Sequence, residues 1–301
     1  MRIIRKVWTH SANDLFVLAI RRARQLVGRG DLGWDYSLTA VLSSPKNMNS
    51  KLEIERWERQ WRVCRLNGLA DVESEFDPFG RSILELGCGP VLGFGPIAIF
   101  RGAERFWYLE PDFSRAVLES LEVKNKYFEP LFHELTANYG RLQSFDEWYS
   151  RIIELSQPFS EGMAGEVDIT LSHSVLEHIP LRELPILLDA LYAASRPDGR
   201  FFHTVDFGPH GGAFNSLYSQ DQTVERQNLN LLRRSEVEAA MSSAGFTHDA
   251  SIVYKTDDVP KSDVHRSWQK YSRTDLESRV VFMIGRRGAT FETAPEIADK
   301  I

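Results

Sequence analysis

A cluster of glycines directly after a short apolar run sets the strongest limit on how this chain can fold. Residues 83 to 95 read ILELGCGPVLGFG, with four glycines within nine positions. Glycine destabilises regular structure, so such a cluster indicates a place where something must approach the backbone closely. The sequence therefore predicts a buried strand over 82–86 and, after it, a loop whose main chain a ligand can reach.

From residue 82 onward, short apolar runs alternate with helical segments, which is typical of an α/β, doubly wound, mostly parallel sheet. Between 124 and 165 the pattern predicts helices, one of them opened by a capping box of Ser144 and Glu147, but no convincing third strand. We expect a helical insertion there that hides or displaces this strand. The predicted strands are Ser82 to Leu86, Arg105 to Leu109, Val167 to Ser172, Arg200 to Val205, Ser251 to Lys255 and Arg279 to Ile284.

The first 75 residues are predicted to form a basic, helical extension to a domain that spans 76–301. Residues 1–30 hold seven Arg or Lys side chains against one acid, so that with a net charge of −6 the rest of the chain carries −12. Residues 15–26 have the spacing of an amphipathic helix, which either packs on the domain or lies on an anionic membrane surface. Further along, Ser50 and Glu53 predict a capping box for a helix that ends at Gly68.

Composition argues against several classes of protein. The acidic body lacks the basic stripe that a nucleic-acid-binding surface needs. The apolar run at 15–20 is far shorter than the roughly 20 residues of a membrane span. Two widely separated cysteines, Cys64 and Cys88, offer no disulfide framework. We therefore expect a cytoplasmic protein, with peripheral membrane contact through residues 1–30 left open and the oligomeric state undetermined.

An acid follows the second predicted strand and gives the glycine loop a partner. Glu110 closes the run FWYLE, where a carboxylate can accept hydrogen bonds from both hydroxyls of a ribose. Glu85, just before the glycines, can pair with a cationic group, while Gly87 and Gly89 let the backbone pass close to a ligand. A ribose with a cationic tail describes S-adenosylmethionine.

Two other interpretations of the loop remain open. A nicotinamide-dependent oxidoreductase would bind a dinucleotide through G-x-G-x-x-G, but Leu92 stands where the third glycine belongs and Gly93 comes one position late. The glycines can also simply form a tight turn between strand and helix.

With these features in place, the chain from about residue 82 to its end resembles a class I S-adenosylmethionine-dependent methyltransferase. ELGCGP is similar to the first motif of that family, YLEPD to its second-strand acid, VDITLSHSVLEHIP to its fourth strand and the turn that follows, RPDGRFF to the passage into its fifth strand, and RRSEVEAAMSSAGF to the helix before its sixth. The resemblance implies a seven-stranded Rossmann-like sheet with a reversed last strand. It also implies cofactor contacts at Glu85, Leu86, Gly87, Cys88, Gly89, Pro90, Gly93, Glu110, Pro111, Ser172 and His173.

The acceptor is less constrained than the cofactor. RQNLNLLRRSEV and VHRSWQKYSRTDL loosely resemble methyltransferases of bacterial polysaccharide and natural-product biosynthesis, which implies a small-molecule acceptor such as a sugar hydroxyl. A hydroxyl needs a base or a metal to become nucleophilic. The predicted catalytic candidates are His173, His178, Asp206 and His210, and no metal is expected because no compact ligand set is present. A non-catalytic binding module with the same fold is a further alternative.

Overall fold

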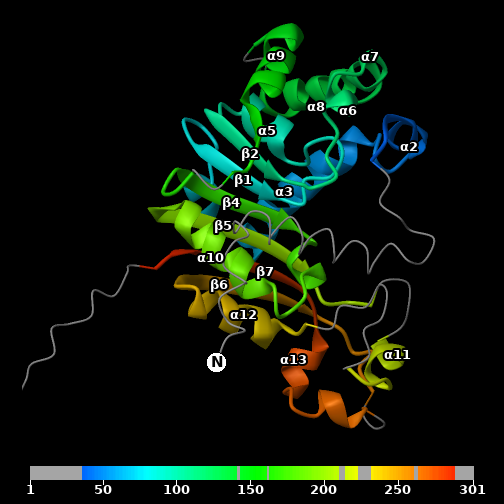
Figure 1. Cartoon of the computed structure of the whole chain (residues 1–301), viewed down its shortest axis with the longest axis vertical. Coiled ribbons are helices and arrows are strands. Elements are labelled where there is room, and N and C mark those ends of the chain that lie inside the picture. The colour runs from blue at the N-terminus through cyan, green and yellow to red at the C-terminus, as the bar shows by residue number, and fades with distance from the viewer. Residues whose placement is uncertain are drawn as a thin grey trace, which may run out of the picture.

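The computed structural model describes residues 36–140, 143–160, 163–209, 214–222, 232–260 and 264–288. The basic arm at 1–30 and His210 therefore lie outside the described residues. Within them, seven strands form one sheet in the order β3-β2-β1-β4-β5-β7-β6, with helices on both faces (Figure 1). The strands are β1 Ser82–Leu86, β2 Arg105–Leu109, β3 Ser156–Pro158, β4 Val167–His173, β5 Ser195–Asp206, β6 Phe246–Lys255 and β7 Ser278–Arg287.

The direction of the strands confirms the predicted fold class. Neighbouring strands from β3 to β5 are paired parallel, whereas β7 runs antiparallel between β5 and β6. The strand order reverses beside β1, and in open α/β sheets ligands bind at the carboxyl ends of the strands near such a point. The fold is a doubly wound, Rossmann-like sheet with a reversed last strand.

The third strand, which the sequence could not place, lies within the predicted helical segment 124–165. It is hidden there and not displaced: β3 follows helix α9 (Phe145–Leu155) and pairs parallel with β2. It is only three residues long, with the sequence Ser-Gln-Pro, and therefore has no apolar alternation by which a strand could be recognised. Helices η2, α8 and α9 precede it in the same segment.

Side-chain caps mark the starts of the two helices for which the sequence predicted a capping box. Ser144 caps α9 and forms the predicted reciprocal capping box with Glu147. For α3 the prediction was off by one residue, because the Asn49 side chain accepts from the Leu52 N–H and Ser50 is already the first helical residue. The helices are α2 Leu38–Ser43, α3 Ser50–Leu66, α4 Val72–Glu75, α5 Gly95–Phe100, α6 Arg115–Leu118, α7 Leu121–Val123, η2 Lys124–Phe128, α8 Glu129–Tyr139, α9 Phe145–Leu155, η3 Leu176–His178, α10 Leu184–Ala194, α11 Phe214–Tyr218, α12 Arg234–Ser243, η4 Arg266–Trp268 and α13 Arg273–Glu277.

Each face of the sheet carries its own hydrophobic core. On one face, residues of α3, α5, α8 and α9 pack against the sheet, and on the other α10 and α12 do so. Helix α3 is anchored by Trp57 and Trp61, whose rings meet edge to face at 5.3 Å; Trp61 also contacts Phe202 of β5 at 5.3 Å. This anchoring fixes the polar side of α3 at the ends of the central strands.

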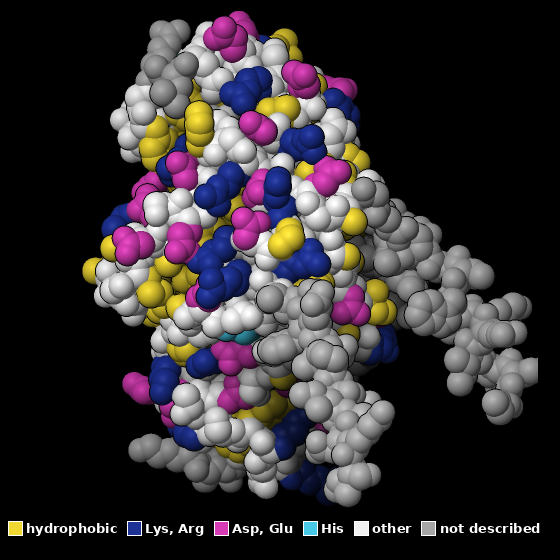
Figure 2. All heavy atoms as spheres, turned by 90° about the vertical axis from the view of Figure 1, so that its left-hand side faces the viewer, with side chains coloured by type: hydrophobic (Ala, Val, Ile, Leu, Met, Phe, Trp, Pro, Cys, Tyr) yellow, Lys and Arg dark blue, Asp and Glu magenta, His cyan; other side chains and the backbone are white. Residues whose placement is uncertain are grey.

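Two absences and the distribution of surface charge characterise the described residues. None of their helices combines the length and apolar character that crossing a bilayer requires. Nor do these residues contain a group of three or more His, Cys, Asp or Glu side chains arranged to hold a metal ion. On the face shown in Figure 2, acidic and basic side chains are interspersed, with several Lys and Arg side chains gathered near the middle.

Candidate functional site

The glycine loop leaves β1 in a left-handed backbone conformation. Gly87, Gly89 and Gly93 have φ values of 65°, 67° and 47°, and Leu92 has 67° although it is not a glycine. A Cβ atom on Gly87 would collide with the Val175 side chain. At Gly89 the nearest group to such an atom is the Tyr36 hydroxyl, at 3.9 Å. Gly89 is therefore the position in this loop where the main chain has room for a neighbour.

Glu85 lies under the loop and stabilises it from within. Its side chain is 3 % exposed, and its Oε2 accepts a hydrogen bond of 2.8 Å from the Phe94 N–H at the start of α5. Burial, and next the nearby Glu53, raise the pKa of Glu85 well above its usual range, opposed by the N–H groups of Phe94 and Gly95. Pairing of Glu85 with a cationic ligand group stays a prediction, because the carboxylate is engaged with the backbone.

Glu110 occupies the position expected of a ribose-binding acid. It follows β2, is 5 % exposed, and accepts hydrogen bonds from the Gly89 N–H at 3.1 Å and the Asp112 N–H at 3.4 Å. These bonds hold the carboxylate against Gly89, the glycine of this loop that has space beside it. The residues at this point fit the ribose end of S-adenosylmethionine, since a carboxylate at the end of the second strand suits vicinal hydroxyls.

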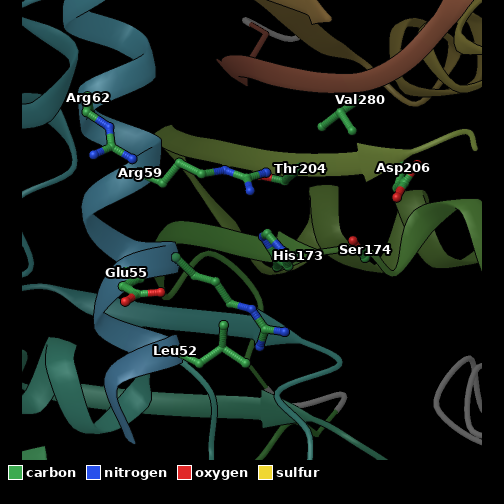
Figure 3. Close-up of a pocket in the computed structure, with 10 residues that line it drawn as sticks. Leu52, Glu55, Arg59, Arg62, His173, Ser174, Thr204, Asp206 and Val280 are labelled. Carbon is green, nitrogen blue, oxygen red and sulfur yellow. The ribbon is translucent and has the colours of Figure 1, made fainter. Parts of the chain in front are cut away.

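A cavity of about 560 Å³ opens between α3 and the carboxyl ends of β4 and β5 (Figure 3). Neither Glu85 nor Glu110 is among its walls, so the two acids do not share it. Polar and charged side chains from three elements converge there, with Arg59 extending from α3 toward Thr204 of β5. The cavity is lined by Leu52, Glu55, Arg56, Arg59, Arg62, His173, Ser174, Thr204, Asp206 and Val280.

His173, a predicted catalytic candidate, is the last residue of β4 and forms part of the cavity wall. Burial, and then the positive charges of Arg56, Arg59 and Lys46, lower the pKa of His173 to about 3. Its buried Nδ1 has no hydrogen-bond partner among the described residues. The imidazole is thus neutral at physiological pH and keeps a nitrogen lone pair for a proton.

Glu177 is a functional candidate that the sequence reasoning missed. It is buried beside the cavity, and its Oε1 accepts from the Asp206 N–H at 3.3 Å, which ties the loop after β4 to the end of β5. Burial raises the pKa of Glu177 well above its usual range. The signal in the sequence was an acid within the apolar stretch VLEHIP, next to the predicted candidate His178.

The other two predicted catalytic residues within the described part of the chain differ in their position relative to the cavity. Asp206 lines the cavity, and its Oδ1 accepts from the Gly208 N–H at 2.8 Å. His178 lies on η3, is not part of the cavity wall, and has its Nε2 4.0 Å from Glu177 Oε1. Of the candidates within the described residues, His173 and Asp206 are brought together in one cavity.

Several of the predicted cofactor-contacting residues have buried side chains. The Ser172 hydroxyl lies 2.8 Å from His203 Nδ1 within the sheet, on the side opposite His173. Leu86 and Cys88 are buried in the cores of the two faces, and Pro90 is also buried, whereas Pro111 is partly exposed. Their cofactor contacts stay predictions.

Comparison with known proteins gives matches at the level of structure. No protein-family model matches the chain, and no curated protein sequence does. Solved structures that match include an S-adenosylmethionine-dependent methyltransferase from Mesorhizobium loti, at 12 % identity and a TM-score of 0.38 over 73 % of this chain and 97 % of the other. Another from Aquifex aeolicus matches at 10 % identity and a TM-score of 0.39, over 84 % and 100 %.

The strand order and the reversed β7 define the fold independently of these matches. They reproduce the arrangement that the motifs ELGCGP and YLEPD implied, with both motifs at the carboxyl ends of adjacent central strands. The chain has the class I S-adenosylmethionine-dependent methyltransferase fold.

Proposed function

We propose that the protein is an S-adenosylmethionine-dependent methyltransferase that acts on a hydroxyl of a small molecule, such as a sugar or a related metabolite. The observation that carries this proposal is the contact between Glu110 and Gly89, because a carboxylate held at the open position of the glycine loop suits the two hydroxyls of a ribose. The cavity with His173 supplies a separate place for an acceptor.

In this proposal the residues divide into two groups. Glu110 and the loop around Gly89 bind and orient the cofactor, which when bound supplies a methyl group activated by a sulfonium. Walls of the cavity hold the acceptor hydroxyl in line with that methyl group and exclude water. During methylation the neutral imidazole of His173 would take the proton of the acceptor hydroxyl.

Titration calorimetry with S-adenosylhomocysteine tests the cofactor assignment. Wild-type protein should bind it, and Glu110→Ala should bind about 10- to 100-fold more weakly, the loss expected when hydrogen bonds to a charged group are removed. Absence of binding to the wild type, or full binding to Glu110→Ala, would remove the proposal.

The same titration separates the alternatives. An NAD(P)-dependent oxidoreductase would bind a nicotinamide dinucleotide in place of S-adenosylhomocysteine. A non-catalytic module would bind S-adenosylhomocysteine without methylating any acceptor in a broad panel. Membrane contact through residues 1–30 stays a prediction, checked by co-sedimentation with anionic vesicles against a deletion of those residues.

A further inference from the structure

Three arginines follow one another along the side of α3 that faces the cavity. Arg56, Arg59 and Arg62 are spaced three residues apart, and all three contribute to the cavity wall. With a rise of 1.5 Å per residue, such a series spans about 9 Å along the helix axis. The packing of Trp57 and Trp61 against the sheet holds this arginine row over the ends of β4 and β5.

The row contains cations that the rest of the described chain does not neutralise. Arg56 pairs with Glu53 at 2.5 Å. Arg59 lies over the Phe282 ring at 5.9 Å, and among the described residues no carboxylate forms an ion pair with Arg59 or Arg62. On the same helix, Arg65 lies outside the cavity and is paired with Glu73.

The opposite wall fits an oxygen-rich ligand. Ser174 and Thr204 contribute hydroxyl groups, and the buried Thr204 Oγ1 has no partner among the described residues. Two acids, Glu55 and Asp206, also line the cavity, but among the described residues neither forms an ion pair with Arg59 or Arg62. A ligand that satisfies both walls has an anionic end for the arginines and hydroxyl groups for the strand ends.

We infer that the acceptor carries an anionic group, a phosphate or a carboxylate, which Arg59 and Arg62 bind at the mouth of the cavity while the hydroxyl to be methylated lies at His173. Arginine suits this role because its planar fork pairs with two oxygens of either group. The inference rests on the proposed methyltransfer and adds to it the class of substrate.

An anion in this position would also change the proton affinity of His173. The charged groups that act on this ring are Arg56 and Arg59 from α3 and Lys46 from the segment before it. Glu55, Arg62 and Asp206 also line the cavity. A bound anion offsets the arginine charges and so favours the protonated imidazole. The pKa of His173 should therefore rise when the anion binds, which makes the ring a stronger base once the acceptor is in place.

Inorganic pyrophosphate and malonate serve as probes for the two chemical sources of the charge. By titration calorimetry, wild-type protein should bind at least one of them, and the double variant Arg59→Gln/Arg62→Gln should bind it at least about tenfold more weakly. Arg59→Lys/Arg62→Lys should recover part of the affinity because it keeps the charge but loses the fork. Arg65→Gln is the matched control on the same helix and should bind like the wild type.

Nuclear magnetic resonance of the His173 ring supplies a second readout, in which the bound probe should raise its pKa in the wild type and not in the double glutamine variant. If neither probe binds the wild type, or the double glutamine variant binds equally well, the inference is overturned. Titration of the same samples with S-adenosylhomocysteine distinguishes failure of this inference from failure of the proposed function. Normal cofactor binding without anion binding leaves the proposed function standing, whereas loss of cofactor binding in the wild type removes both.

Discussion

Gly93 can be tested as the position where the glycine loop and the buried acid depend on each other. In Gly93→Ala the new Cβ would lie 2.9 Å from Glu85 Cδ and 3.0 Å from the Cys88 carbonyl oxygen, and closer still to Glu85 Oε1. The carboxylate is buried and bound to the Phe94 N–H, so it cannot move without giving up that bond. The substitution should therefore destabilise the fold and disturb the loop together.

The size of the effect follows from two contributions. A residue with a Cβ at φ of 47° costs about 1–2 kcal/mol in the left-handed region. Displacing Glu85 from the Phe94 N–H leaves buried polar groups without a partner and adds about 1–3 kcal/mol. Gly68→Ala isolates the first contribution, because Gly68 has φ of 76° and nothing within 4 Å of the added atom.

Urea unfolding followed by circular dichroism measures both variants. Gly93→Ala should lose about 1–3 kcal/mol more free energy of unfolding than Gly68→Ala, which is the contribution of the displaced carboxyl group. It should also bind S-adenosylhomocysteine more weakly, while Gly68→Ala binds normally. Equal losses of stability in the two variants would show that Glu85 does not depend on the absence of a side chain at residue 93.

Three further outcomes follow from buried groups near the site. Leu92 is fully buried and has φ of 67°. In urea unfolding, Leu92→Gly should therefore be about 1 kcal/mol more stable than Leu92→Ala, the reverse of the usual order for these two residues. Both variants should be less stable than the wild type. The pKa of Glu177 is raised in the folded state, so the stability that its protonated form contributes is full below about pH 4 and is lost as pH rises. In urea unfolding, Glu177→Gln should therefore gain stability relative to the wild type as the pH rises above about 5. The His173 imidazole, whose pKa is lowered to about 3, should show constant ring nitrogen shifts from pH 8 to pH 5, and protonation near pH 6.5 would contradict its burial among cations.

The sequence predicted best where a local pattern also determined the structure. Strands β1 and β2 begin and end at the predicted residues, because each is an apolar run bounded by charge or glycine. The contact between Glu110 and Gly89 follows from the same pattern, since parallel neighbouring strands bring their carboxyl ends together. The strand β3 could not be found in this way, because three residues with one proline carry no periodicity.

The cavity wall was hidden from sequence reasoning for a different reason. Arginines at intervals of three on an amphipathic helix ordinarily describe a solvated face. Only the docking of α3 across β4 and β5 turns Arg59 and Arg62 into one side of a cavity, and that docking is a tertiary contact between distant parts of the chain. Glu177 was missed likewise, because its burial depends on how the loop after β4 meets Asp206.

The short edge strand β3 also has a consequence for how the molecule meets its neighbours in concentrated solution. The Phe159 N–H is directed inward to the Tyr108 carbonyl of β2 at 2.9 Å, and successive residues of a strand direct their backbone groups to alternate sides. The outward position before it is therefore Pro158, which has no N–H to offer. A strand of another molecule that approached this edge would find no N–H donor at Pro158. The proline therefore disfavours edge-to-edge strand pairing and aggregation there.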